Sequence, residues 1–425
     1  MTVEARFGRE LAERLSSLSP YPESTFSGFG IVICAGGPAY FTNAYVLVHV
    51  LRRHLNCTLP IEVWHIGRRE MSSRMALLLE DLDVSVVDAT SEMNARGASF
   101  VDGWQLKSFA LMWCRFQQAL LLDADQVPIR DPAPIAEWPE FQQKGAVLWP
   151  DVSDLLAGNE IWEACGLPPR RMTSVESGQI LIDKSRHWGA LQIAFHLNER
   201  ARYYYSMLYG DKDTFLLGML LTNSPFALVP HRPMTDRGLC LYQRDFDGAP
   251  LFQHRTGAKW RYAGKQDELP GFLCADACLA ALGELRRKWN GLVVDAPHRS
   301  ENARNAEKRL FAGGGVAFLV LGQAPIRLEL LAEGDIGDGR SVDRLNWHCE
   351  EDRGEIHLLI SDAFGLTWRL AERPGGRWYG RSVVDPQIEA FASEALKVED
   401  AKEDRRAWVR WPLLGQYSDT DELDF

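Results

Sequence analysis

The sequence predicts an α/β fold for residues 1–300 and a small antiparallel β-rich module for residues 301–425. In the first part, short apolar runs typical of buried strands alternate with stretches of helical periodicity. In the second part, short apolar runs are separated by Gly and Asp-Gly breakers, which favours antiparallel strands joined by turns. The length of 425 residues also fits two domains.

The N-terminal part of the first domain can be followed element by element. Residues 1–27 are predicted to be a helical extension, since their leucines recur at helical spacing among charged residues, unlike a signal peptide. The continuous apolar run at 30–35 predicts the first buried strand. The breaker at 36–38 ends this strand, and Thr42 or Asn43 is expected to cap the helix that follows.

The rest of the first domain continues the alternation of strand and helix. Each predicted strand is a short aliphatic run, and each predicted helix carries apolar residues three or four positions apart. Strands are expected at 61–66, 84–87, 119–122, 145–149 and 179–182, and helices at 71–81, 104–116, 188–201 and 213–221.

The second domain is expected to follow a solvated polar linker at 296–308. We expect Trp368, Trp378 and Trp411 to form its core, and residues 397–406 to form a charged tail. Its strands are predicted at 316–321, 326–331, 356–361 and 366–370.

Composition excludes several classes of protein. Lys and Arg number 47 against 58 Asp and Glu, which gives a net charge of −11 and argues against a nucleic-acid partner. No apolar stretch approaches the ~20 residues of a membrane span, so no integral membrane segment is predicted. The eight cysteines form no C-x-x-C pair, which excludes zinc ribbons and indicates buried reduced thiols. We therefore expect a cytoplasmic enzyme.

The strongest candidate for chemistry is the tripeptide Asp123-Ala124-Asp125. Other Asp-x-Asp tripeptides occur in the chain, but this one ends a predicted buried strand. Both carboxylates should then emerge at the carboxyl edge of the sheet, where open α/β sheets bind ligands. Two carboxylates on one side make an oxygen-rich site for Mg²⁺ or Mn²⁺ with room for phosphate oxygens. The alternative is a charged strand end that enters a loop.

Three further features suit a diphosphate ligand. Gly36 and Gly37 follow the first strand and permit close approach of a nucleotide, although neither a dinucleotide fingerprint nor a P-loop surrounds them. A glycine between His254 and Lys259 lets a loop direct the imidazole to a metal and the ammonium to a phosphate. Lys107, on the helix before the Asp123 strand, is a second cation for the same phosphates or part of a solvated helix face.

Side chains that suit sugar hydroxyls lie in two segments. Glu176 and Gln179 enter a predicted strand, and Asp211 and Asp213 open a predicted helix. Capping and the helix dipole are the alternative explanation for the two aspartates. Three tryptophans can stack on sugar faces or fill the core: Trp64, Trp104 and Trp149.

In this order, these segments resemble the fungal-type α-mannosyltransferase family that extends mannan side chains. The resemblance covers residues 28–265, and a looser likeness to glycogenin-like retaining transferases lies at 211–213 and 254–260. It implies the GT-A fold, a single Rossmann-like mixed sheet flanked by helices. The segments that carry it are 30–37, 59–64, 120–132, 148–151, 176–179, 183–188, 210–215, 252–255 and 259–260.

The resemblance also implies an activity and a set of site residues. The protein would be a metal-dependent retaining glycosyltransferase that moves a sugar, with mannose from GDP-mannose as the leading donor, to an acceptor hydroxyl. Asp123, Asp125 and His254 would hold Mn²⁺ or Mg²⁺. Asp211, Glu176 and Asp213 would be the catalytic residues that position hydroxyls, with helix capping as the alternative for Asp213. The donor would be bound by Ala35, Gly36, Gly37, Lys107, Asp123, Ala124, Asp125, Gln179 and Lys259.

Several alternatives remain open at the level of sequence. The same machinery can serve UDP-glucose or UDP-galactose, and a glycan-binding protein on a degenerate transferase scaffold is the non-enzymatic alternative. A sugar nucleotidylyltransferase would need a basic residue after the Gly-Gly turn, and residues 38–43 supply none. Fungal members carry an N-terminal membrane anchor that is not expected here, and residues after 310 lie outside the resemblance. The acceptor is therefore a glycan, a lipid-linked intermediate, a small molecule or a protein.

Overall fold

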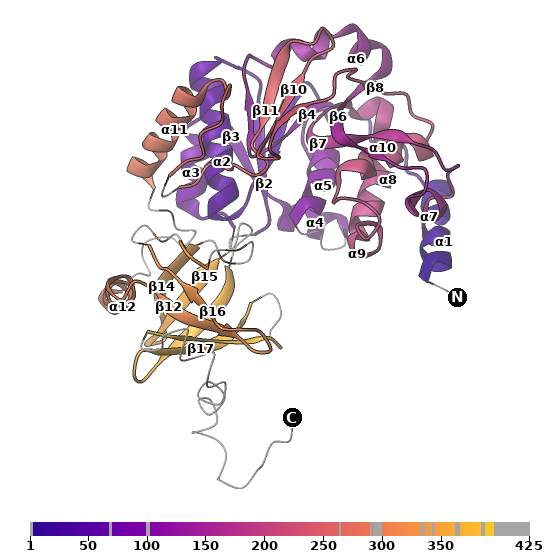
Figure 1. Cartoon of the computed structure of the whole chain (residues 1–425). Helices are drawn as coiled ribbons and strands as arrows, with labels where there is room; N and C mark the ends of the chain where they lie inside the picture. Colours follow the sequence, from indigo (N-terminus) through magenta and orange to yellow (C-terminus); the bar gives the residue numbers. More distant parts are fainter. Residues whose placement is uncertain are drawn as a thin grey trace. The chain divides into compact units, whose positions relative to one another are not determined.

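A computed structural model places the chain in two compact units (Figure 1). One unit comprises residues 1–36 and 40–288, and the other comprises 37–39 and 289–425. Within these units the structure describes residues 3–394, except 68–69, 99–102, 263–264, 290, 292–299, 332–333, 335, 340, 342–343, 345, 362–365 and 384–386.

A mixed seven-stranded sheet is the frame of the first unit. Its order is β3-β2-β1-β4-β7-β6-β8, and β3, β2, β1 and β4 are mutually parallel. β7 is antiparallel to both β4 and β6. The sheet thus confirms the predicted α/β class. The strands are β1 (Phe29–Cys34), β2 (Ile61–His65), β3 (Val84–Asp88), β4 (Gln118–Asp123), β6 (Ala146–Leu155), β7 (Met172–Asp183) and β8 (Ala227–Leu228).

A second, four-stranded antiparallel sheet was not predicted from the sequence. Its order is β5-β11-β10-β9, with β5 (Gln126–Pro128), β9 (Met234–Asp236), β10 (Cys240–Arg244) and β11 (Pro250–His254). β5 begins directly after the Asp123-Ala124-Asp125 turn and pairs with β11. This pairing brings residue 254 beside residue 126, and it determines the geometry of the site.

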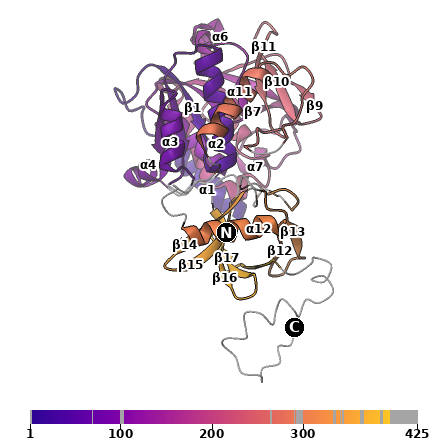
Figure 2. The ribbon, with the colours of Figure 1, turned by 90° about the vertical axis from the view of Figure 1, so that its left-hand side faces the viewer.

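The helices cover the large sheet as the alternation predicted. α5, α8 and α10 pack with β1, β4 and β7 in one apolar core that contains Phe109, Leu121 and Phe215. α11 packs on α2 through another apolar cluster (Figure 2). The helices of this unit are α1 (Val3–Ser16), α2 (Gly37–His49, of which 37–39 belong to the other unit), α3 (Ser73–Glu80), α4 (Ala89–Arg96), α5 (Leu106–Trp113), α6 (Pro139–Lys144), α7 (Ile161–Ala164), α8 (Lys184–Glu199), α9 (Ala201–Tyr204), α10 (Lys212–Leu221) and α11 (Ala275–Lys288).

The predicted start of α2 was wrong. The helix begins at Gly37 with Gly36 as its N-cap, and Pro38 lies in its first turn, where proline is well tolerated. Asn43 is therefore inside the helix, and its side-chain amide pairs with the backbone of Trp260. Thr42 is likewise buried within the helix and does not cap it.

The second unit contains a seven-stranded antiparallel sheet, as its sequence predicted. The strand order is β13-β12-β18-β17-β16-β15-β14. Trp368 and Trp378 lie in its core as expected, together with Trp347, whereas Trp411 and the tail at 397–406 lie outside the described residues. The strands are β12 (Val316–Val320), β13 (Ile326–Leu328), β14 (Asn346–Asp352), β15 (Glu355–Ser361), β16 (Leu366–Arg373), β17 (Arg377–Ser382) and β18 (Glu389–Ser393).

Part of the predicted linker is in fact a helix. α12 (Glu301–Ala312) is capped by Ser300, and Ala303, Ala306 and Leu310 are buried in the core of the second unit. Because two of these three residues are alanines, the apolar stripe of α12 is weak in the sequence. The described helices include none that is long and apolar enough to span a membrane, and all eight cysteines are free.

Candidate functional site

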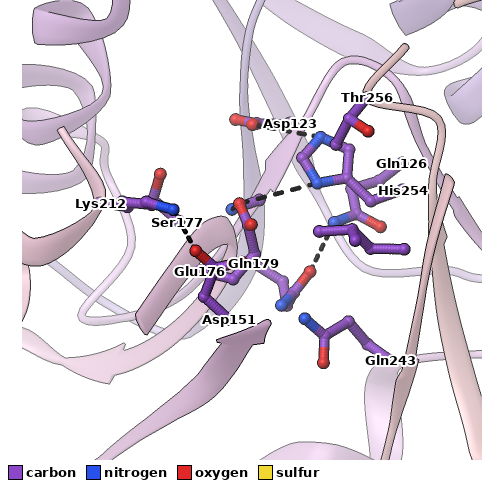
Figure 3. A network of polar contacts seen from close by, with 12 residues as sticks. Asp123, Gln126, Asp151, Glu176, Ser177, Gln179, Lys212, Gln243, His254 and Thr256 are labelled. Carbon is purple, nitrogen blue, oxygen red and sulfur yellow. Dashed lines mark hydrogen bonds and ion pairs between the residues drawn. The ribbon is translucent and has the colours of Figure 1, made fainter. Parts of the chain in front are cut away.

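The predicted metal ligands are brought together at the end of β4. Asp123 is the last residue of β4, Asp125 lies in the turn to β5, and His254 is the last residue of β11. One ligand atom from each side chain lies within 4.8 Å of the others. His254 Nε2 is 3.0 Å from Asp125 Oδ1. The same nitrogen is 3.6 Å from Asp123 Oδ2, and Figure 3 shows these two side chains beside each other. We call these three residues the metal triad.

Each carboxylate of the metal triad has a lysine partner. Lys107 Nζ on α5 is 2.8 Å from Asp123 Oδ1 and 3.4 Å from Asp211 Oδ2, and it donates a 3.2 Å hydrogen bond to Ser177 Oγ. Lys259 Nζ donates to Asp125 Oδ2. Lys107 is only 7% exposed, so its alternative interpretation as part of a solvated helix face was wrong.

Opposite charges in this cluster shift one another's pKa values so that each group stays ionised. Burial alone would raise the pKa of Asp125, but the Lys259 ammonium and the His254 imidazole hold it far below its usual range. Burial would lower the pKa of Lys107, yet Asp123 and Asp211 raise it well above its ordinary value. For His254, burial lowers the pKa, but Asp125, Glu176 and Asp123 together outweigh burial and raise it. The group is therefore a dense ionic network away from bulk water, as is common at functional sites.

Two of the predicted catalytic carboxyls adjoin the metal triad. Glu176 Oε1 is 3.7 Å from His254 Nδ1 and accepts a 3.1 Å hydrogen bond from the Gly178 N–H. Asp211 reaches the triad through Lys107. Burial is the first cause that raises the pKa of both carboxyls. Glu176 lies inside β7 rather than before a strand, because β7 is longer than predicted.

The third predicted catalytic residue, Asp213, is hydrogen-bonded to β7. Its carboxylate accepts hydrogen bonds from Ser174 Oγ at 2.7 Å and from the Val175 N–H at 2.9 Å. These bonds tie the first turn of α10 to β7. A catalytic role for Asp213 stays a prediction, and its contacts explain the residue as a structural link.

The remaining predicted donor-binding residues lie at the same edge of the sheet. Ala35 follows β1 and is buried, and Ala124 lies between the two triad aspartates. Gly36 packs against Glu70 so closely that a Cβ would lie 2.2 Å from Glu70 Oε2, and Gly37 has a φ of +68°. Gly36 thus leaves no space for a Cβ beside Glu70, whereas Gly37 has a positive φ that favours glycine. Their contact with a donor stays a prediction.

Gln179 belongs to a buried cluster of amides next to His254 (Figure 3). Its Oε1 accepts a hydrogen bond from Gln126 Nε2, while Gln243 Nε2 donates to Pro150 O at 3.0 Å. Within the described residues, Gln179 Nε2, Gln126 Oε1 and Gln243 Oε1 have no protein partner. Buried amides without partners are costly, so these atoms are suited to accept or donate toward a bound hydroxyl or water.

Sequence reasoning missed one ion pair of the site. Lys212 Nζ donates to Asp151 Oδ2, and the same carboxylate accepts hydrogen bonds from the Val152 N–H and Ser153 Oγ. Ser177, which contacts Lys107, was also missed. These three missed residues lie in segments that carry the family resemblance, namely 148–151, 176–179 and 210–215. Only the antiparallel pairing of β6 and β7 brings residues 151 and 176 into one cluster.

The three tryptophans considered for sugar stacking divide into two groups. Trp64 and Trp149 are completely buried and belong to the core. Trp104 is 49% exposed. The core alternative is therefore confirmed for two of them and wrong for Trp104.

Comparison with known proteins agrees with this arrangement. Residues 28–163 and 169–243 match the family model described as "Mannosyltransferase putative". This match includes β4, β7 and the start of α10, and thus Asp123, Asp125, Glu176 and Asp211, whereas His254 and Lys259 lie beyond it.

Curated relatives are similar over about half of the chain. Alpha-1,2-mannosyltransferase MNN5 of Saccharomyces cerevisiae is 24% identical in an alignment 313 residues long, which covers 59% of this chain and 53% of that protein. Alpha-1,2-mannosyltransferase MNN21 of Candida albicans is 28% identical in an alignment 251 residues long, which covers 46% of this chain and 38% of that protein. The chain thus spans about half the length, or less, of the curated relatives it matches.

Solved structures are only distantly similar. The mannosyltransferase Ktr4p of S. cerevisiae superposes with a TM-score of 0.32 at 10% identity, over 54% of this chain and 77% of that one. A likeness of this size adds nothing to the fold described above. The family-model match places the chain: it belongs to the mannosyltransferase family whose model matches residues 28–163 and 169–243.

Proposed function

We propose that the chain is a metal-dependent retaining glycosyltransferase that transfers mannose from GDP-mannose to an acceptor hydroxyl. The observation that carries this proposal is the metal triad, with Lys107 and Lys259 paired to its carboxylates. Family membership supports the transfer of mannose, since the curated relatives are named as mannosyltransferases. Retention of configuration, the acceptor class and the cytoplasmic location stay predictions.

The chemistry of the metal triad fits a divalent cation. Two carboxylates and one imidazole supply hard oxygen ligands and one nitrogen, a set that suits Mn²⁺ and also permits Mg²⁺. These three residues would hold the cation, which would supply positive charge to stabilise the leaving nucleoside diphosphate.

The two lysines are placed to share that task. Lys259 keeps 34% of its side chain exposed although it pairs with Asp125, so it can turn from this carboxylate to a diphosphate. Lys107 is buried and stays between Asp123 and Asp211. Fixed cations directed at developing negative charge are the largest catalytic contribution in many transfer reactions.

The buried carboxyls supply the polar contacts for sugars. Glu176 lies 3.7 Å from His254, and Asp211 lies 3.4 Å from Lys107. We expect each carboxyl to accept a hydrogen bond from a sugar hydroxyl. The intact triad favours an enzyme over a degenerate binding scaffold.

A donor panel tests this function. The purified chain is mixed with GDP-mannose, UDP-glucose or UDP-galactose, with Mn²⁺ or with EDTA, and the released nucleoside diphosphate is measured. We expect release from GDP-mannose with Mn²⁺, and its loss with EDTA and in Asp125→Asn. Asp183→Asn is the matched control, because Asp183 lies at the far end of β7 and caps α8. Equal release in EDTA, or no release from any donor, would contradict the proposal.

A further inference from the structure

Two exposed aromatic residues flank the Asp211 segment. Trp104 is 49% exposed and Tyr209 is 82% exposed, although most large aromatic side chains of this unit are buried. Neither residue is explained by the packing of the core. Trp104 packs on Gly210, which directly precedes Asp211, and Tyr209 lies beside Lys212. Both aromatic residues are therefore close to the proposed active site.

Trp104 is linked to the site by two routes. It lies in the 3₁₀ turn Gly103–Gln105 directly before α5, the helix that carries Lys107. Its indole also packs on Gly210, where an added Cβ would lie 3.1 Å from Trp104 Cε3. Gly210 has a φ of +73°, so this glycine lets the chain pass over the indole immediately before Asp211. The indole therefore packs on the residue that directly precedes Asp211 in the chain.

Tyr209 is exposed but anchored. Leu208 and Gly210 on either side of it are buried, and the preceding turn is held by a 2.8 Å hydrogen bond from Asn159 Nδ2 to Met207 O. Lys212 Nζ lies 4.9 Å from the centre of the Tyr209 ring and pairs with Asp151. The phenol ring is therefore next to the Asp151–Lys212 ion pair, which Figure 3 shows beside Glu176 and Ser177.

We propose that Trp104 and Tyr209 form an acceptor platform for a pyranose ring, with Asp151 and Lys212 as partners for its hydroxyls. This inference rests on the proposed function. The C–H face of a pyranose packs on aromatic rings, while its rim of hydroxyls needs charged or polar groups. The two aromatic rings would supply the packing surface. The Asp151 carboxylate, the Lys212 ammonium and Asp211 would supply the polar contacts. The acceptor is thus a saccharide end rather than a lipid or a peptide.

The platform places the acceptor for the transfer step. The acceptor hydroxyl oxygen forms a bond to the anomeric carbon of the donor, and the bond from that carbon to the diphosphate oxygen breaks. The electron pair leaves with the nucleoside diphosphate, and the hydroxyl proton passes to its departing phosphate oxygen. Asp211, between the platform and Lys107, is placed to orient the acceptor hydroxyl.

Binding of methyl α-mannopyranoside tests the platform. Its dissociation constant is measured by saturation-transfer NMR on the chain loaded with Mn²⁺ and GDP, for wild type, Trp104→Ala and Tyr209→Ala. We expect each alanine variant to weaken this binding roughly tenfold, the equivalent of about 1.4 kcal/mol, and Trp104→Phe and Tyr209→Phe to retain it. Affinity for GDP, measured by calorimetry, should be unchanged. Leu77→Ala is the matched control, since Leu77 on α3 is 51% exposed.

The outcomes separate this inference from the proposed function. If wild type binds GDP but binds no saccharide, or if both alanine variants bind the saccharide as wild type does, the platform is wrong and the proposed function stands. If wild type transfers mannose to a long-chain alcohol or a Ser/Thr peptide but not to the saccharide, the acceptor class is wrong. Failure of wild type to bind GDP contradicts the proposed function itself.

Discussion

At the scale of single residues, two buried lysines show how surroundings decide the behaviour of a charge. Lys107 lies among carboxylates, which raise its pKa well above the ordinary value against the effect of burial. Lys184, at the start of α8, instead donates to Met112 O at 3.0 Å and Cys114 O at 2.7 Å, and its Nζ lies 3.3 Å from the centre of the Phe26 ring. Burial lowers the pKa of Lys184 to about 8.

Lys184 gives a prediction for the pH dependence of stability. The unfolded chain, in which lysine titrates near 10.5, binds more protons than the folded chain between pH 8 and 10.5. The contribution of Lys184 to the free energy of unfolding should therefore rise with pH in this window, by up to about 1.4 kcal/mol for each pH unit. Urea unfolding of wild type and Lys184→Met at pH 7.5 and 9.5 measures this rise. A wild-type-minus-variant difference that is the same at both pH values would contradict it.

The residues found from the sequence were those whose chemistry is visible locally. Asp123 and Asp125 end an aliphatic run, and His254 and Lys259 flank a glycine. Asp151 and Lys212 were missed because each has an ordinary local explanation, and their partnership depends on the fold. The exposure of Trp104 also had no local signal, since an indole in an α/β domain is usually buried.

At the scale of elements, close packing of α8 and α10 supports the active site. Gly218 on α10 lies against Ala190 on α8, and an added Cβ at Gly218 would lie 2.4 Å from the Ala190 backbone oxygen. α10 begins at Lys212, directly after Asp211. The glycine thus lets the helix that follows Asp211 lie flat on its neighbour.

Gly218→Ala should therefore destabilise the protein. We expect a loss of about 1–3 kcal/mol in the free energy of unfolding, because the methyl group would push two helices apart. Gly8→Ala in α1 is the matched control, since nothing lies within 4 Å of its added Cβ. This control should gain roughly 0.5–1 kcal/mol from helix propensity. Urea unfolding measures both variants, and equal effects of the two substitutions would contradict the packing argument.

Elements with a clear hydrophobic pattern in the sequence were predicted well, whereas elements that are short or weakly apolar were not. β1 and β4 are continuous apolar runs, and both were found within one or two residues. β5 and β9 span three residues each, too few to show a period, so the small sheet that supplies His254 was missed. The start of α2 was misread because a proline in a first turn looks like a breaker.

At the scale of the whole molecule, the two units have separate apolar cores. All residues of the metal triad, their lysine partners and the acceptor platform belong to the unit of residues 1–36 and 40–288. Among the described residues discussed for the candidate site, only Gly37, a predicted donor-binding residue, belongs to the second unit. The two cores can therefore be perturbed one at a time.

Trp378→Ala should destabilise the second unit without loss of nucleotide binding. Trp378 is completely buried in that core, so its truncation should cost about 3–5 kcal/mol. Thermal unfolding and GDP calorimetry measure the two effects. Trp149→Ala, which removes an equally buried indole from the first unit, should impair both. Loss of GDP affinity in Trp378→Ala would contradict the assignment of the site to the first unit.

One titration decides whether the metal triad acts as proposed. GDP is titrated calorimetrically into wild type and Asp125→Asn, each with Mn²⁺ and with EDTA. The proposed site predicts that Mn²⁺ strengthens binding to wild type roughly tenfold or more, or about 1.4 kcal/mol, and that Asp125→Asn abolishes this gain. Equal affinity of wild type for GDP in Mn²⁺ and in EDTA would contradict it.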